Sequence, residues 1–349
     1  MLVLKRHWVR LLFRIHQIKL LAGSPGAVFR GYSAHLEPGG KAYDRHLKQE
    51  IEEYRRVHGE SDEATNVPNI PLIEPAPASW LDMQGRAATR IRTATGDDVY
   101  GHVLSRLRAR EGVRMLSLGS GPGGLELQFA REARSAKIVC IDVNAGLLEK
   151  GCAQAASEGL AVEFRQGDLN TILLPPENFD LVFCHASLHH LLELEHIFQQ
   201  IKRTLKPHGE LIVIDVITRH GYRMWPETRK VIDKIWKTLP AAYRVNHTSY
   251  HVKMIDEKIV DADSRRSNME CIRSEDILPL LEAGFDTFAY VPYYSLCRRL
   301  FDTMYGPNYD LDRALDRAIL DWLWALDCYY LGTGILRPET FFGIYRPKR

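Results

Sequence analysis

The feature that most constrains the fold is a short apolar run that leads directly into a cluster of glycines. Met115 to Leu118 predicts a buried strand, and the glycine-rich turn Gly119-Ser-Gly-Pro-Gly-Gly124 follows it. Apolar residues at helical spacing over 125–134 then predict a helix. Glycine has no Cβ, so such a turn can be tight and can let a ligand lie against the backbone. A strand, a glycine turn and a helix predict the first unit of a nucleotide-binding α/β sheet.

More apolar segments follow this unit, in alternation with helical patterns or loops. Strands that read as continuous apolar runs are typical of a parallel sheet covered on both faces. The predicted fold class is therefore α/β: a doubly wound, mostly parallel seven-stranded sheet with helical cap insertions and an N-terminal helical arm. The six further strands are expected at 136–142, 161–164, 179–184, 210–216, 285–291 and 341–345.

The pattern also predicts how the chain is divided. Proline-rich sequence over 60–78 predicts a linker between the arm and the core, and the stripe Leu315, Ile319, Trp322 and Leu326 predicts a packed helix in the second insertion. The expected segments are 1–78 (basic helix, charged helix and linker), 79–217 (cofactor-binding core), 218–273 (cap insertion for the substrate), 274–292 (core helix and sixth strand), 293–340 (second helical insertion) and 341–349 (last strand).

Composition gives no argument for a nucleic-acid partner and predicts a cytoplasmic location. The 349 residues carry a formal net charge of only +2, which gives no general argument for nucleic acid as a partner. Six scattered cysteines without CxxC spacing predict reduced thiols in a cytoplasmic protein. No apolar run reaches the ~20 residues of a membrane-spanning helix.

The first 36 residues are basic, with six Lys or Arg and no acidic residue. Leu4, Trp8, Leu11 and Ile15 would share one face of a helix there. A basic amphipathic helix can lie on an anionic membrane, which would give peripheral contact through residues 1–20 at the inner membrane face. A helix docked on the core, or an unstructured arm, explains the same pattern.

The glycine turn alone does not identify its ligand. Residues 119–124 satisfy GxGxxG, the dinucleotide fingerprint, and also GxGxG. Asp142 lies about one βαβ unit downstream, where a carboxylate meets ribose hydroxyls. NAD and S-adenosylmethionine both fit these two features, so an NAD(P)-dependent oxidoreductase remains an alternative.

An ordered set of motifs adds a family resemblance. The stretches 118–123, Asp142, Gly167-Asp168, 179–191 and 205–211 occur in that order at short intervals. Together they resemble the class I, seven-stranded S-adenosylmethionine-dependent methyltransferases over about residues 98–216. The resemblance implies S-adenosyl-L-methionine as the cofactor and methyl transfer as the reaction. Asn-Pro-Pro-Tyr, frequent after the fourth strand in enzymes that methylate nucleic-acid bases, is replaced here by His185-Ala-Ser-Leu, which argues against a nucleic-acid base as the acceptor and leaves other RNA acceptors open.

The resemblance also implies which residues bind the cofactor. The glycine turn would pass under the methionine part, and Asp142 would bind the ribose hydroxyls. Asp168 would bind the adenine amino group, and His185 would lie next to the sulfonium. The implied cofactor-binding residues are Gly119, Ser120, Gly121, Gly123, Asp142, Val143, Asp168, Leu169 and His185.

A base is needed when the methyl acceptor must lose a proton, and histidine suits this role near neutral pH. The candidate catalytic residues are His185, His247 and His251, whereas His189 and His190 are interpreted as packing at a helix start. His247 and His251 could share a helix face as metal ligands do, but no third ligand is evident and no metal is predicted.

The first insertion bears on the acceptor. Its basic and aromatic residues fit a polar or anionic acceptor with a ring, although they could simply fill a small cap core. We expect an oxygen of a small-molecule or glycan-type acceptor; methyltransferases of RNA, protein or lipid and a non-catalytic cofactor-binding module remain alternatives. The sequence does not predict the oligomeric state. The residues concerned are Arg223, Trp225, Arg244 and Tyr250.

Overall fold

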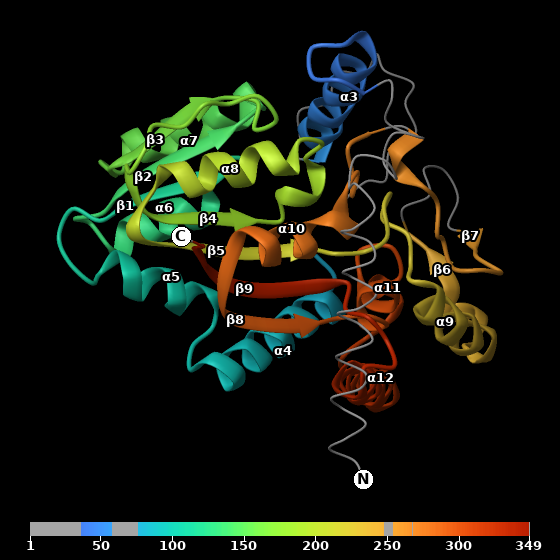
Figure 1. Ribbon diagram of the computed structural model, residues 1–349. Coiled ribbons are helices and arrows are strands. Elements are labelled where there is room, and N and C mark those ends of the chain that lie inside the picture. Colours follow the sequence, from blue (N-terminus) through green and yellow to red (C-terminus); the bar gives the residue numbers. More distant parts are fainter. Residues whose placement is uncertain (1–35, 58–75, 248–253, 267, 349) are drawn as a thin grey trace.

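The computed structural model describes residues 36–57, 76–247, 254–266 and 268–348 (Figure 1). The predicted N-terminal helix, most of the proline-rich segment and His251 lie outside these ranges. Within them, no helix is both long and apolar enough to cross a membrane.

One seven-stranded sheet organises the fold, in the order β3-β2-β1-β4-β5-β9-β8. The pairs among the first five strands are parallel, and β9 is antiparallel to both β5 and β8. The predicted fold class, a mostly parallel seven-stranded sheet, is thereby confirmed. The strands are β1 Arg114–Leu118, β2 Lys137–Asp142, β3 Val162–Gln166, β4 Phe179–His185, β5 Leu205–Val216, β8 Phe285–Tyr293 and β9 Thr340–Pro347.

Helices cover both faces of this sheet. Successive residues of a strand point to opposite faces, so Met115 and Leu116 of β1 enter separate apolar cores. The first core packs under α5, α6 and α7, with Phe129 and Phe183 in edge contact, and the second packs under α8 and α10. The bounds are α5 Val99–Leu107, α6 Gly124–Glu132, α7 Ala145–Ser157, α8 Leu194–Thr204 and α10 Ile277–Gly284.

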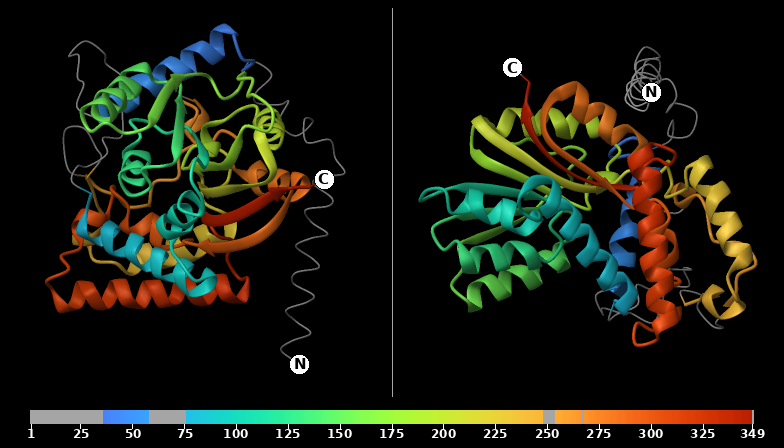
Figure 2. Two further views of the ribbon diagram at one scale, coloured as in Figure 1. Left: turned by 90° about the vertical axis from the view of Figure 1, so that its left-hand side faces the viewer. Right: turned by 90° about the horizontal axis from the view of Figure 1, so that it is seen from below.

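Most of the remaining elements gather beyond the carboxyl ends of β4 and β5, whereas α4 lies against β8 and α3 stands near the end of β3 (Figure 1). Helix α12 runs alongside α4, and Arg86 of α4 pairs with Asp321 of α12 at 2.5 Å (Figure 2). The bounds are α3 Lys41–Val57, α4 Ala78–Thr95, α9 Pro226–Thr238, α11 Cys297–Phe301 and α12 Ala314–Thr333, with a two-stranded sheet of β6 Val245–Asn246 and β7 Met254–Ile255.

The buried face of α12 differs from the predicted stripe. Leu315 and Trp322 are each 60% exposed, whereas Leu320 and Leu323 are buried together with two aspartates. The predicted stripe is right for Ile319 and Leu326, which pack against the first core, and wrong for Leu315 and Trp322, because the pattern counted only apolar residues. Helix α12 turns Asp316 and Asp327 inward, where each accepts hydrogen bonds from buried groups.

Asp327 holds the start of α11. Its carboxylate accepts hydrogen bonds from the backbone N–H groups of Ser295, Leu296 and Cys297 at 3.0–3.2 Å. Burial raises the pKa of Asp327, although these N–H groups oppose the shift. The carboxylate therefore fixes the turn that follows Tyr294, a residue with a φ of +55°.

We expect Asp327→Ala to lower the free energy of unfolding by about 3 kcal/mol, because three buried N–H groups would lose their acceptor. Urea denaturation measures this change. Asp321→Ala on the same helix is the control; its side chain is 57% exposed, so the loss should stay under about 1 kcal/mol. Equal losses for the two variants would show that Asp327 has no special role.

Candidate active site

The glycine turn is fixed against its neighbours. Gly119 has a φ of +71° and its N–H donates to the carbonyl of Ile141 at 2.8 Å, which ties the turn to β2. A Cβ at Gly119 would lie 2.4 Å from the Cβ of Ser187, and one at Gly123 would lie 2.7 Å from the ring of Phe164. No other residue fits these positions without displacing the chain.

Asp142 ends β2 beside this turn. One carboxylate oxygen accepts from the N–H of Gly121 and the other from the N–H of Asn144, both at 2.8 Å. Burial raises the pKa of Asp142, while these two bonds favour the ionised form. Each oxygen keeps a lone pair, so the fixed carboxylate can accept both hydroxyls of a ribose. The two acceptor oxygens of Asp142 thus fit the ribose of an adenosyl group.

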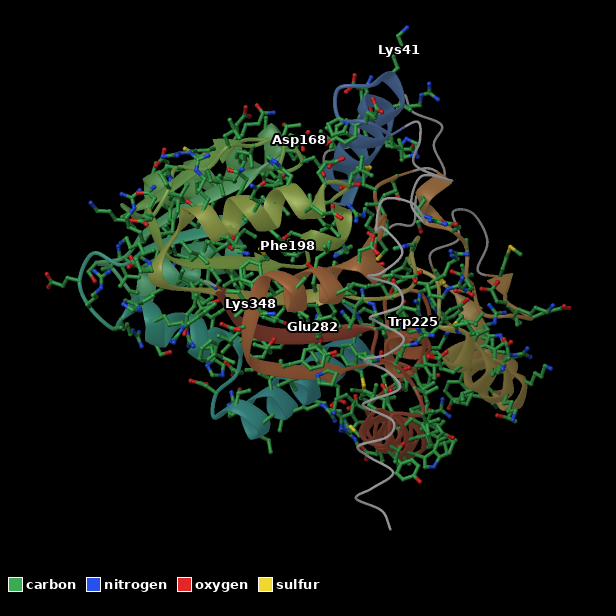
Figure 3. All side chains as sticks on the ribbon, in the orientation of Figure 1. Lys41, Asp168, Phe198, Trp225, Glu282 and Lys348 are labelled. Carbon is green, nitrogen blue, oxygen red and sulfur yellow. The ribbon has the colours of Figure 1, made fainter. Side chains whose placement is uncertain are left out.

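Asp168 follows β3 and is already bonded within the protein. One oxygen accepts from Tyr43 of α3 at 2.6 Å, and the other accepts from the backbone and side chain of Asn170. Tyr43 is buried, and Figure 3 shows Asp168 beside α3. A carboxylate has about four lone-pair sites, which leaves about one for an adenine amino group. Val143 is half-buried and Leu169 is buried in the second core.

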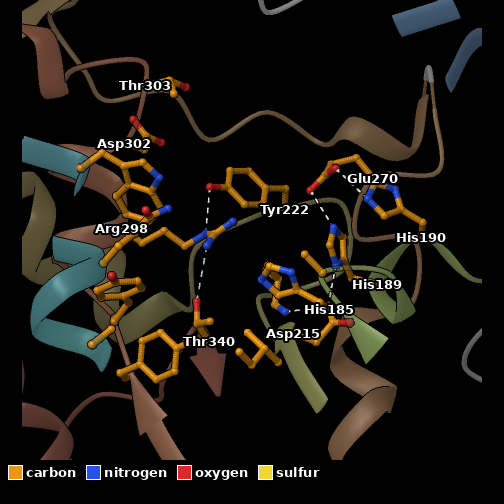
Figure 4. Close-up of a pocket in the computed structure, with 18 of the residues that line it drawn as sticks. His185, His189, His190, Asp215, Tyr222, Glu270, Arg298, Asp302, Thr303 and Thr340 are labelled. Carbon is orange, nitrogen blue, oxygen red and sulfur yellow. Dashed lines mark hydrogen bonds and ion pairs between the residues drawn. The ribbon is translucent and has the colours of Figure 1, made fainter. Parts of the chain in front are cut away.

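A cavity of about 710 Å³ lies past the ends of β4 and β5. This size is typical of small-molecule sites. Its wall is formed by α4, the start of α11, the strand ends themselves, residues 302–304, and Ser264, Asn268 and Glu270. Figure 4 shows two groups of side chains across it, Arg298 and Asp302 on one side and three histidines with Glu270 on the other.

His185 is the last residue of β4 and lines this cavity. Its ring stacks on Phe183 with centroids 6.0 Å apart, and no described residue accepts or donates a hydrogen bond at its ring nitrogens. The ring is exposed to the cavity, but the surrounding protein removes part of its hydration, which lowers the pKa of His185 below its ordinary value of 6.5. The ring is therefore neutral near pH 7 and can accept a proton.

His189 and His190 also line the cavity, in the short 3-10 helix Leu188–His190. The sequence interpretation of both as packing at a helix start missed this. Nδ1 of His189 lies 2.5 Å from Asp215, and because an ionised carboxylate cannot donate, the ring N–H donates. Burial opposes ionisation of Asp215, but His189 and backbone N–H groups hold the pKa of Asp215 below its usual value.

Glu270 lies between the two histidines. Its oxygens are 3.6 Å from His189 Nε2 and 3.7 Å from His190 Nε2, and Nδ1 of His190 is 3.1 Å from Glu50 of α3. Burial alone would lower the pKa of His190, but Glu50 and Glu270 raise it to about 10. The cavity thus has one strongly acidic and imidazole-rich side.

The donor atoms of His189, Glu270 and Cys271 lie within 4.8 Å of one another, a spacing that could hold a metal ion. The sequence considered only His247 and His251 for this role. His247 lies outside the cavity wall, with Nε2 2.7 Å from Asn308 Oδ1, and the structure does not bring it to His185. His251 lies outside the described residues, and the prediction that no metal is bound stays a prediction.

The side chains expected to bind the acceptor lie elsewhere. Arg223 is 3.8 Å from Asp263, and Trp225 lies under the guanidinium of Arg337 and donates to the carbonyl of Pro338. Figure 3 shows Trp225 among the cap elements, and neither residue lines the cavity. Arg244 is also absent from the wall, and Tyr250 lies outside the described residues.

Backbone strain marks the cavity. Ala186, Tyr222 and Tyr294 all line it and have φ values of +52°, +60° and +55°. Side chains other than glycine seldom adopt this region, and such residues cluster at functional sites. Positive φ at these three positions has no signal in the sequence.

Comparisons with known proteins identify the class. Residues 109–282 match the family model described as a methyltransferase domain. The chain is 26% identical over 212 residues to a ubiquinone/menaquinone biosynthesis C-methyltransferase of Paraburkholderia phymatum, covering 59% of this chain and 79% of that protein. A protein of the same name from Escherichia fergusonii is 28% identical over 197 residues, covering 54% and 70%.

Solved structures with similar folds include the [4+2]-cyclase SpnF, at 17% identity and a TM-score of 0.43, covering 78% of this chain and 97% of that one. A SAM-dependent methyltransferase of Aquifex aeolicus matches at 16% identity and a TM-score of 0.38, covering 76% and 97%.

The sheet order, the glycine turn bonded to the carboxylate of Asp142, and the family match define a methyltransferase. The chain belongs to the class I S-adenosylmethionine-dependent methyltransferases. It is an enzyme with S-adenosyl-L-methionine as cofactor, which removes the NAD(P)-dependent alternative.

We expect Asp142→Ala to abolish the rise in melting temperature that S-adenosylhomocysteine gives the wild type, because the ribose hydroxyls would lose their acceptor. Thermal-shift titration measures this. Asp233→Ala on α9, whose side chain is 41% exposed and pairs with Arg229, should keep the full shift. An undiminished shift in Asp142→Ala would place the ribose elsewhere.

Proposed function

We propose that this methyltransferase acts on an oxygen of a small-molecule acceptor, glycan-type acceptors included, held in the cavity at the end of β4. The observation that carries the proposal is His185, a neutral imidazole in the cavity wall without a hydrogen-bond partner among the described residues. A hydroxyl must lose its proton as it is methylated, and a free imidazole beside it is the group that accepts one.

The bound cofactor supplies a methyl group already activated by its sulfonium. The chain's own residues orient the reactants. We propose that the turn of residues 119–123, Ser120 included, carries the methionine part, that Asp142 holds the ribose, and that Val143, Asp168 and Leu169 surround the adenine. Holding two reactants in line can supply ~7–11 kcal/mol of the barrier.

In the proposed step, the acceptor oxygen gains the methyl group as it loses its proton. The O–CH₃ bond forms as the S–CH₃ bond breaks, the electron pair of that bond stays on sulfur, and the hydroxyl proton passes to a ring nitrogen of His185. A sugar or alkyl hydroxyl is much less acidic than imidazolium, so proton removal accompanies attack. His247 has no part in this step because it lies outside the cavity wall.

A carbon acceptor is the second candidate, because the curated relatives are named C-methyltransferases. A carbon nucleophile beside an enol or phenol hydroxyl would use the same imidazole to remove the proton. The cavity serves both candidates, and the product decides between them.

The proposals of a cytoplasmic location and of peripheral contact through residues 1–20 at the inner membrane face rest on the sequence pattern alone. They are separate from the proposal for the acceptor.

The acceptor atom can be tested with cofactor carrying a ¹³C-labelled methyl group and a panel of phenolic, enolic and sugar acceptors. We expect a product whose methyl ¹³C resonance has the shift of a methyl on oxygen, which lies well downfield of a methyl on carbon. A carbon-bound methyl would establish the second candidate instead, and label on nitrogen would contradict both.

We expect His185→Ala to lower kcat at least ~100-fold with cofactor affinity little changed. Partial loss of hydration lowers the pKa of His185, so the neutral base persists to a pH below 6.5. The wild-type rate should therefore fall only below that pH, as the imidazole becomes protonated, and the variant should lack this acidic limb. Steady-state rates from pH 5 to 9 measure both effects.

His208→Ala is the matched control, because His208 is exposed in β5 and lies outside the cavity wall. It should leave kcat and the pH profile unchanged. Near-normal turnover in His185→Ala would remove His185 as the base.

A further inference from the structure

Arg298 is the arginine in the described wall of the cavity. It lies in the first turn of α11 and reaches between Tyr222 and Thr340 (Figure 4). Its Nε donates to the hydroxyl of Tyr222 at 3.0 Å, and Nη1 lies 3.5 Å from Oγ1 of Thr340. Both contacts are with neutral hydroxyls, and Glu339, which pairs with Arg299, favours the charged form of Arg298 only from beyond salt-bridge distance.

No carboxylate of the described residues lies within 4.0 Å of the Arg298 guanidinium. Its neighbour Arg299 differs, because it pairs with the buried Glu339 at 2.7 Å. Asp302, also in the wall, accepts from the backbone N–H of Met304 at 2.9 Å. A guanidinium away from water is costly without a counter-charge, and here the open side of Arg298 faces the cavity.

Aromatic faces and a free hydroxyl complete this side. The Arg298 guanidinium carbon lies 5.3 Å from the ring centre of Tyr222 and 6.0 Å from that of Trp80. Trp80 packs against Tyr294 with centroids 5.4 Å apart, and the buried Tyr294 hydroxyl has no hydrogen-bond partner. Burial raises the pKa of Tyr294, so this hydroxyl stays protonated and can donate.

The opposite side of the cavity carries most of the negative charge, although Asp302 lies on the same side as Arg298. Glu50, Asp215 and Glu270 surround the two histidines there. An anion would be repelled from that side and attracted to Arg298, so an anionic acceptor could enter in only one orientation. Its far end would then face His185.

We propose that the acceptor carries an oxyanion, a carboxylate or a phosphate, and that Arg298 and the Tyr294 hydroxyl bind it while Trp80 and Tyr222 contact an adjoining ring. This inference rests on the proposed function for the identity of the bound molecule as the acceptor. Bidentate binding of carboxylate or phosphate is what a guanidinium does best.

The inference is tested by direct binding, without turnover. Benzoate, phenyl phosphate and the neutral isostere benzamide are titrated by calorimetry into full-length protein saturated with S-adenosylhomocysteine. We expect benzoate or phenyl phosphate to bind and benzamide not to bind measurably. The anion with the lower dissociation constant indicates whether the acceptor carries a carboxylate or a phosphate.

Arg298→Gln should weaken anion binding roughly tenfold to hundredfold, the worth of a charge-assisted hydrogen bond, and Arg298→Lys should recover part of it. Arg337→Gln is the matched control: Arg337 also stacks on a tryptophan, at 3.6 Å, but lies outside the wall. It should bind anions as the wild type does. The S-adenosylhomocysteine shift, retained in every variant, verifies folding.

Equal binding of benzamide and benzoate, or unchanged anion binding in Arg298→Gln, would overturn the inference, as would no binding of any probe. These outcomes leave methyl transfer itself untouched, because the labelled-product experiment measures it separately. Conversely, Arg298-dependent anion binding without methylation of any acceptor would support the anion site and count against the proposed function.

Discussion

The carboxylate of Asp215 is the interaction on which both halves of the site depend. It is the second-to-last residue of β5 and accepts hydrogen bonds from the backbone N–H groups of Ser187, Leu188 and Val216 as well as from His189. These bonds fix the sharp turn after β4. The Cβ of Ser187 then packs against Gly119, whose turn is bonded to Asp142 through Gly121. The buried carboxylate of Asp215 therefore fixes the position of the cofactor turn relative to the acceptor cavity.

The sheet and the cofactor turn could be predicted from the sequence because their signals are local. Leu116 and Val182 sit in continuous apolar runs, and the glycines follow a strand directly. In parallel sheets such runs are buried on both faces, so these strands can be predicted without knowledge of tertiary contacts. The same locality placed His185 correctly at the end of β4, where the structure shows it in the cavity wall.

The rest of the site depends on contacts between distant residues. Arg298 meets Tyr222 across 76 positions, and Tyr43 meets Asp168 across 125. No spacing rule connects such pairs, so the sequence analysis named the basic residues of the first insertion, Arg223 and Arg244, in place of Arg298. Helix α4 was missed because its core face, Met83, Ala87 and Ile91, is a narrow stripe among charged residues. The burial of Asp316 and Asp327 in α12 was not predicted, because the hydrogen-bond donors that make a buried carboxylate stable lie far away in the sequence.

The order of the strands has a consequence for how the protein is made. Strand β9 is synthesised after every other strand of the described sheet, yet it lies between β5 and β8. Until it emerges from the ribosome, β5 presents an open apolar edge and β8 has no neighbour to pair with. Open edges of this kind recruit foreign strands. The nascent chain therefore passes through a stage in which chaperone protection of β5 matters more than at any time after release.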